Sequence, residues 1–527
     1  MVLTNTHSRS AVSPKNVAFE EYQVENINKD ETHQFVIDEE GMRSEETTLA
    51  EKDRDEAFDF LKKTEQVLHG GSVPYPKALA RKIDMRIMTV MCGSYFLQFI
   101  DKNSLNLAAV LGIKAHLEDH PNGFANLGTI FYASYIFAEP FASYLLQVLP
   151  TSKFLSACII AWGCVVACHA ACKTYASLMV IRTLLGIFEA ALSPGLIVIS
   201  SMYWTKEENM KRTGIWVSFA GLSTIVGGLL SFAFQHVHAS LESWQIFFLV
   251  LGCVTIVFGI YMYMVLPNNP TSASFLTEEE KMIVLEHIRV NQTGTENKTF
   301  KKKQIMELLF RDKHTWPLFF LTIISMISTG ALGTWSVTIY KTFGFSSKVS
   351  SLLQMPVGAA MIIAILGGTY TCSKIGKRTI VFMIMCLPGI AGYVILLENP
   401  NRIANLISIY MIMGSTGVIA LLYSWNSANT AGHTKKIARN AMTMIAFSIG
   451  SLIGPQLFRA DEAPEYRTAK AVLIATSVVS VPLAGLVGYI SKKENERRDK
   501  MGPVTLPPNY EFRDLTDIEN PNFRYAY

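Results

Sequence analysis

The sequence predicts an all-α membrane protein with twelve transmembrane helices in two six-helix halves and both termini in the cytoplasm. Three observations support this prediction. Of the 527 residues, 50% are hydrophobic and only 17% are charged, and the apolar residues fall into long blocks. Each block is close to the roughly 20 residues that an α-helix needs to cross a bilayer. A charged stretch separates six blocks from six, and lysines and arginines concentrate in alternate connections.

The apolar blocks define the predicted spans. Glycine and proline occur inside several of them, which transmembrane helices tolerate. The first half is predicted to span at approximately 87–110, 125–148, 154–173, 176–201, 213–235 and 245–266. The second half is predicted to span at approximately 316–340, 350–372, 379–397, 403–426, 437–458 and 469–490.

The connections predict the orientation and the division into domains. Basic residues such as Arg81, Lys211, Lys374 and Lys435 fall in one set of connections, which the positive-inside rule assigns to the cytoplasm. Five parts follow: a disordered acidic cytoplasmic tail over 1–75, a six-helix bundle over 76–266, a cytoplasmic central loop over 267–315, a second six-helix bundle over 316–490, and a cytoplasmic C-terminal tail over 491–527.

The central loop contains one predicted surface helix. Its sequence TEEEKMIVLEHIRVNQ is amphipathic, and Thr277 followed by Glu280 has the spacing of a capping box. Six spans on either side of such a loop indicate two repeated halves, an arrangement that places a substrate site near the membrane midplane between them.

Five ionisable residues inside the predicted spans are the main functional candidates, because charges are costly in a bilayer. They are Asp101, Lys102, Glu139, Arg182 and Glu189. Arg182 and Glu189 are two helical turns apart on one face, about 10 Å along the axis, so each can meet a facing helix. Ion pairs that tie helices together are the alternative interpretation of these charges.

The chemistry of these residues suits an organic anion and protons. An arginine fork binds both oxygens of a carboxylate. A buried acid can exchange a proton as its surroundings change. Tyr132 shares a helix face with Glu139. Trp425 and Asn426, near the end of the tenth span, are candidates for hydrogen bonds to a substrate, although an asparagine there can also be a helix cap.

Several functional classes lack their motifs in this chain. The sequence has no phosphate-binding G-x-x-x-x-G-K-[ST] loop, no H-E-x-x-H and no G-x-S-x-G. The eight cysteines lie in or beside apolar blocks without a C-x-x-C pair, as packing residues do. Basic residues are spread over the loops rather than clustered. We therefore expect no enzymatic activity, no cofactor, no metal and no nucleic-acid partner.

Local motifs carry a family resemblance that covers about residues 77–527. The segment RTLLGIFEA, starting at Arg182, with Pro194 after it, resembles the fourth-helix motif of the anion:cation symporter branch of the major facilitator superfamily. The segment FIDKNSLN around Asp101 resembles the first-helix motif of that branch. Three later segments, SANTAGHTKK, LIGPQLFRADEAPEYRTAK and FRDLTDIENPNFRY, resemble the fungal allantoate permease family.

This resemblance implies a major facilitator fold and a monomeric carrier in the fungal plasma membrane. It implies proton-coupled uptake of a small organic anion: an allantoate- or ureidosuccinate-like nitrogen compound, a small peptide, or a vitamin carboxylate such as nicotinate or pantothenate. By position, Lys102 and Arg182 would face the substrate carboxylate, and Tyr132 and Trp425 would line the cavity. Asp101 and Glu189 would carry the protons, with Glu139 as a further candidate.

Two departures from the family pattern and two rival functions stay open. The segment LPTSKFLSA lacks most of the usual Gly-Asp-Arg gating motif, and MTMIAFSIGSLIGP lacks an asparagine that some relatives have. An exporter working by proton antiport is one rival, but GLSTIVGGLL in the fifth span lacks the proline of the antiporter motif. A nutrient sensor that signals with little transport is the other.

Overall fold

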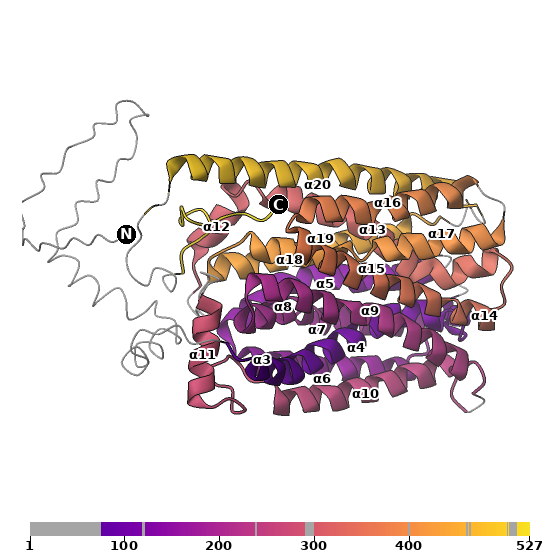
Figure 1. Ribbon diagram of the computed structural model, residues 1–527. Coiled ribbons are helices and arrows are strands. Elements are labelled where there is room, and N and C mark those ends of the chain that lie inside the picture. The colour runs from indigo at the N-terminus through magenta and orange to yellow at the C-terminus, as the bar shows by residue number, and fades with distance from the viewer. Residues whose placement is uncertain are drawn as a thin grey trace, which may run out of the picture. The chain divides into compact units, whose positions relative to one another are not determined.

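The computed structural model of this protein describes residues 75–117, 122–237, 240–289, 300–398, 401–459, 462, 465–502, 504 and 514–527 (Figure 1). Regular structure within these ranges is helical, and no strand occurs in them. The predicted tail over 1–75 lies outside the described residues, apart from Tyr75.

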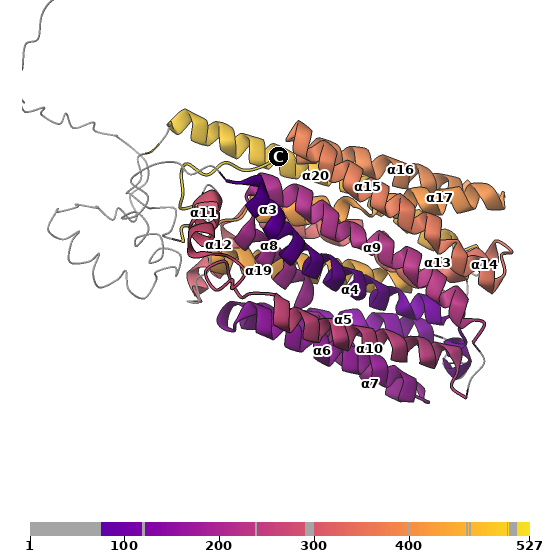
Figure 2. The same ribbon diagram turned by 60° about the horizontal axis from the view of Figure 1, so that its bottom comes forward.

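The first half consists of long helices that run alongside one another (Figure 1, Figure 2). A short α3 (Lys77–Ile83) and a π-helical turn η1 (Asp84–Met88) lead into it. The helices that follow are α4 (Thr89–Ala108), α5 (Gly123–Val148), α6 (Thr151–Cys168), α7 (Tyr175–Glu189), α8 (Leu192–Tyr203), α9 (Lys206–Phe234) and α10 (Ser243–Val265), with 3-10 turns η2 (Ile113–Leu117) and η3 (His169–Ala171) between them.

The second half repeats this plan. Its helices are α13 (Thr315–Thr342), α14 (Ser347–Leu352), α15 (Gln354–Ile375), α16 (Arg378–Glu398), α17 (Arg402–Ser415), α18 (Val418–Ala428), α19 (His433–Gln456) and α20 (Arg467–Met501). Two shorter helices, α11 (Glu278–Arg289) and α12 (Lys302–Phe310), lie between the halves in sequence.

The predicted central-loop helix is confirmed as α11. The Thr277 hydroxyl accepts a hydrogen bond from the Glu280 backbone N–H at 3.2 Å, and the Glu280 carboxylate accepts one from the Thr277 N–H at 2.9 Å. This is the reciprocal capping box that the sequence predicts.

Ten helical segments of the described chain are long and apolar enough to cross a membrane. They correspond to ten of the twelve predicted spans. The other two spans coincide with α4, of 20 residues, and α5, of 26 residues, which do not meet that composition. In α4 the adjacent Asp101 and Lys102 add to the polar content. That these two helices also cross the membrane stays a prediction.

Glycines allow the two halves to pack closely along α9 and α15. A side chain added at Gly221 would come 2.5 Å from the carbonyl oxygen of Gly358, which is too close for any residue but glycine. Gly228 faces the Ser351 carbonyl oxygen in the same way, at 2.6 Å. Small residues of this kind let transmembrane helix backbones approach one another.

The helix bundle has two distinct ends. Figure 1 shows α11 and α12 at one end and α14 at the other. We call the first the basic end, because the connections around Arg378 and Lys435 lie there, in contact with residues 514–527. At the opposite end Asn106 donates a hydrogen bond to Ser336 at 2.9 Å, across the two halves.

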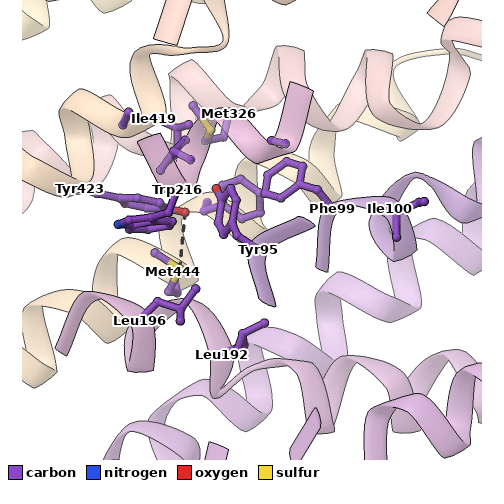
Figure 3. Close-up of a cluster of buried hydrophobic side chains, with 14 of the residues drawn as sticks. Tyr95, Phe99, Ile100, Leu192, Leu196, Trp216, Met326, Ile419, Tyr423 and Met444 are labelled. Carbon is purple, nitrogen blue, oxygen red and sulfur yellow. Dashed lines mark hydrogen bonds between the residues drawn. The ribbon is translucent and has the colours of Figure 1, made fainter. Parts of the chain in front are cut away.

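The halves also meet at the basic end. The Gln147 amide in α5 donates to the Thr434 hydroxyl in α19 at 3.0 Å. Figure 3 shows the rings of Trp216 in α9 and Tyr423 in α18 stacked on one another. Their centroids are 6.1 Å apart. Contacts at both ends therefore enclose the space between the halves.

Candidate functional site

A small cavity lies between the two halves. Its volume is about 50 Å³, which is room for a few water molecules but not for an organic solute. Because the halves also touch at both ends, substrate entry requires them to separate at one end. The first half lines the cavity with Lys102, Tyr132 and Arg182 among other residues.

The lining differs between the halves. All the charge comes from the first half, together with polar Asn103 in α4 and Thr224 in α9. The second half contributes no charge: it supplies the apolar side chains Met361, Met413 and Phe447, together with Gly333 and the hydroxyls of Thr329 and Thr334. A bound molecule would thus meet cations on one side and an uncharged wall with polarizable methionines on the other.

Local sequence explains why α5 and α7 approach closely here. Gly186 follows Arg182 by about one turn of α7, and a side chain at Gly186 would come within 3.1 Å of the Tyr135 backbone nitrogen. The α7 helix ends at Glu189, and Pro194 cannot donate a backbone hydrogen bond to the residue four positions before it. The helical hydrogen bonding is therefore interrupted between Glu189, where α7 ends, and Leu192, where α8 begins.

Lys102 and Glu189 form a buried ion pair. The Lys102 ammonium lies 3.3 Å from Glu189 Oε1, and the two side chains are 6% and 0% exposed. The ammonium also faces the rings of Tyr135 and Phe447, with centroids at 5.3 and 5.1 Å. Neither carboxylate oxygen of Glu189 has a hydrogen-bond partner among the described residues.

Arg182 lines the cavity with an unused donor. The side chain is 3% exposed, and its Nη2 has no hydrogen-bond partner among the described residues. Its guanidinium lies 5.5 Å from the ring centroid of Phe248 in α10. Buried polar groups rarely stay unpaired, so this guanidinium has capacity for a ligand.

None of the three predicted acids, Asp101, Glu139 and Glu189, is among the residues that line the cavity. Asp101 accepts hydrogen bonds from Trp162 Nε1 at 2.9 Å and from the Ser104 hydroxyl at 3.5 Å. Glu139 accepts from the Ser143 hydroxyl at 3.1 Å through one oxygen, while its other oxygen has no partner among the described residues. Both are fully buried.

The structure does not bring Trp425 and Asn426 to the cavity, contrary to their predicted positions. Both lie in the last turns of α18, which ends at the basic end. Trp425 Nε1 donates to the Ala526 carbonyl oxygen at 3.0 Å, and the Asn426 amide donates to the Leu422 carbonyl oxygen at 3.0 Å. The side-chain N–H donors of both residues are thus bonded to backbone carbonyl oxygens.

Sequence reasoning missed the apolar part of the lining. Met361, Met413 and Phe447 are apolar residues within apolar helices, and nothing in the sequence separates them from residues that face lipid. Asn103 could have been found, because an amide inside a span is costly in lipid.

Comparisons with known proteins agree with this architecture. The sequence profile of the Major Facilitator Superfamily matches residues 91–455. The Thiamine pathway transporter THI73 of Saccharomyces cerevisiae is 51% identical over 472 residues, covering 89% of this chain and 90% of the relative. The Allantoate permease of the same yeast is 33% identical over 470 residues, covering 85% and 86%.

Solved structures share the fold at low sequence identity. The human organic anion transporter MFSD10 (TETRAN) has a TM-score of 0.57 at 13% identity, covering 77% of this chain and 99% of that one. A bacterial homologue of the lysosomal transporter Spinster has a TM-score of 0.54 at 14% identity, covering 76% and 96%. The chain therefore belongs to the major facilitator superfamily and, within it, to the fungal allantoate permease-like transporters: it is a multi-pass membrane transporter, not an enzyme.

Proposed function

We propose that this transporter imports a small organic anion together with protons. The observation that carries the proposal is Arg182: a buried guanidinium that lines the cavity between the halves and retains an unpaired donor. Arginine is suited to bind a carboxylate through two parallel hydrogen bonds. Lys102, on the same side of the cavity, supplies a second cation.

Charge balance provides the coupling. With Asp101 and Glu189 ionised, they neutralise Lys102 and Arg182, and an arriving anion adds one uncompensated negative charge. The arriving anion competes with Glu189 for Lys102. In this closed form the Lys102 ammonium lies 3.3 Å from the Glu189 carboxylate. A carboxylate that loses its cation in a buried site favours the protonated form. Binding of the anion would thus draw in a proton, and release of either would favour release of the other.

Asp101 is the second proton-linked acid in this scheme. Its hydrogen bond from Trp162 fixes its carboxylate, so its protonation would be felt by the helices that pack around it. Glu139 remains the third candidate, since one of its carboxylate oxygens has no hydrogen-bond partner among the described residues.

The substrate is a small molecule with an anionic group and an apolar portion. Lys102 and Arg182 would hold the anion, Tyr132 would line the path, and Met361, Met413 and Phe447 would contact the apolar portion. Allantoate- or ureidosuccinate-like compounds, small peptides and vitamin carboxylates such as nicotinate or pantothenate fit this description. Similarity to the thiamine pathway transporter favours a second candidate, a compound of that pathway.

The charge of the substrate separates these two candidates. A cationic compound would be repelled by Lys102 and Arg182, the charged residues that line the cavity. An anion would depend on Arg182. By the positive-inside rule we place the basic end in the cytoplasm. The family resemblance extends the proposal to a monomer in the plasma membrane.

The test is uptake by intact yeast cells that lack their own related permeases. Arg182→Ala is expected to abolish uptake of the anionic substrate while the protein still reaches the membrane. Arg402→Ala is the matched control, because Arg402 is exposed at the start of α17. Normal uptake by the Arg182 variant would contradict the proposed role. Substrate efflux driven by the proton gradient, in place of uptake, would support an exporter instead.

A further inference from the structure

Residues 514–527, which we call the docked segment, lie against the basic end of the second half. Arg498 of α20 is the centre of this contact. Its guanidinium donates to three backbone carbonyl oxygens of the segment: those of Asp517 at 2.9 Å, Asn520 at 3.0 Å and Phe523 at 2.9 Å. Arg498 is 3% exposed. The segment thus folds around one buried cation and has a defined conformation.

A buried ionic cluster adds to this attachment. Lys435 near the start of α19 lies 2.8 Å from Asp517 Oδ1 and 2.8 Å from Glu307 Oε1 in α12. Beside it, Arg439 pairs with Asp312 at 2.5 Å. A buried cation is tolerated only when acids neutralise it, so Asp517 ties the docked segment to α19 and α12.

The end of the docked segment holds α18. The Ala526 backbone forms two hydrogen bonds with the Asn429 amide: its N–H donates at 2.7 Å and its carbonyl oxygen accepts at 3.0 Å. The same carbonyl oxygen accepts from Trp425 Nε1 at 3.0 Å. Residues two apart on a helix point to different faces. Trp425 therefore attaches one face of α18 to the docked segment. Tyr423 lies on another face of α18, which contacts the first half.

The beginning of the docked segment caps α19. Gly432 is the N-cap residue of α19 and has no side chain to accept a hydrogen bond. Asp514 supplies the missing acceptor: its Oδ1 accepts from the His433 backbone N–H at 2.5 Å. An acid at a helix N-terminus satisfies a free donor and the helix dipole. The next residue in α19 is Thr434.

These attachments flank two of the contacts between the halves at the basic end. Tyr423, which is two residues before Trp425, stacks on Trp216 of the first half (Figure 3). Thr434, which directly follows His433, accepts a hydrogen bond from Gln147 of the first half. The docked segment therefore fixes α18 and α19 at the positions from which they reach the first half.

We propose that the docked segment is a positioning element for closure at the basic end. When docked, it presents Tyr423 and Thr434 to Trp216 and Gln147. When released, α18 and α19 lose their attachment and the basic end opens more readily. This inference goes beyond the proposed transport function and holds for any substrate, because it concerns only the equilibrium between closed and open forms.

The test is the distance between spin labels on the two halves, measured by electron paramagnetic resonance in the full chain in lipid. Labels are placed at Lys153 in α6 and Lys492 in α20, which are both exposed. A separate label at Arg524 reports whether the segment is docked. The native cysteines are replaced, and the closed form is the reference.

Two variants release the segment. One lacks residues 514–527. The other, Arg498→Gln with Asp517→Asn, removes the buried cation that donates to three carbonyl oxygens of the segment and the acid that pairs with Lys435. Asp499→Asn is the matched control, since it breaks only an exposed ion pair with Arg524.

We expect both releasing variants to move population from the short to the long distance between positions 153 and 492, and the control to leave the distribution unchanged. If the deletion variant does not reach the membrane, the distance distribution of the double variant alone tests the proposal. A mobile label at position 524 with an unchanged distance distribution would overturn the proposal, as would the same opening in the control.

Discussion

In the interior of the first half, the ammonium of Lys102 lies 3.3 Å from a carboxylate oxygen of Glu189, with both side chains almost fully buried. The pair joins α4 to the end of α7, next to the cavity that Lys102 and Arg182 line. A substrate anion and the Glu189 carboxylate would compete for the same cation. This competition is the proposed link between the anion and the proton.

The acids of the site can be tested by neutral substitutions of the same shape. We expect Glu189→Gln to retain exchange of substrate but to lose accumulation driven by a pH gradient, because the variant cannot bind the coupling proton. Asp101→Asn is expected to act alike. If uphill uptake remains dependent on the pH gradient in both single variants and in the double variant, the two acids do not carry the coupling proton. Glu139 would then be the next acid to substitute.

Trp162 is expected to position Asp101. Trp162→Phe removes the indole N–H that donates to Asp101 at 2.9 Å but keeps an aromatic ring. A hydrogen bond to a charged group contributes about 1.5–3 kcal/mol, so we expect at least roughly a tenfold loss of uptake rate and a shifted pH profile. Trp316→Phe is the control, because Trp316 is exposed at the start of α13. An unchanged pH profile in Trp162→Phe would contradict this role.

Gly186 is expected to be needed for the close packing of α5 on α7. An alanine there would meet the Phe131 carbonyl oxygen and the Ser134 side chain. Overpacking of this kind costs about 1–3 kcal/mol. We predict a lower melting temperature for purified Gly186→Ala. Gly367→Ala is the control, since a side chain at Gly367 meets no atom within 4 Å. Equal melting temperatures would show that α5 and α7 can separate without cost.

Lys114 predicts a pH effect at the opposite end. It lies between α4 and α5, donates to Thr338 of the second half at 3.1 Å, and faces the rings of Phe124 and Trp335. Burial, with a contribution from nearby Lys341, lowers the pKa of Lys114 to about 8 in this closed form. In an open form exposed to water its pKa would be nearer the usual ~10.4.

The sign of the effect follows from these two values. Between about pH 8 and 10 the closed form has released the proton and the open form has not, so raising the pH favours closure at the opposite end. Below about pH 8 both forms are protonated and the equilibrium is independent of this group. Spin labels across the opposite end should show this shift in the unmodified protein and not in Lys114→Met. The same pH response in the variant would assign it to another group.

Part of the candidate site could be predicted from the sequence because charges inside spans are rare and costly. Lys102, Arg182 and Tyr132 line the cavity as predicted from this logic and from the family motifs. Trp425 and Asn426 do not line the cavity. The sequence places them within a span but does not tell how far along the helix the cavity lies. Trp425 is instead held by Ala526, a contact between residues far apart in sequence.

The remaining features depend on tertiary packing. Apolar spans predict helices but not which face meets the partner half, so Met413 and Phe447 could not be distinguished from residues in contact with lipid. The segment after α20 is expected from its sequence to be a tail. Its residue Asp517 is instead buried against Lys435, and no local pattern indicates that pairing.

The most direct test of the central claim is transport by the purified protein in lipid vesicles with an imposed pH gradient. Labelled allantoate, ureidosuccinate, nicotinate, pantothenate and thiamine would be compared, with Arg182→Ala as the inactive control. We predict that at least one anion accumulates against its gradient when the outside is acidic, and that collapsing the pH gradient abolishes this accumulation. Accumulation of thiamine alone, or of an anion regardless of the pH gradient, would contradict proton-coupled anion import.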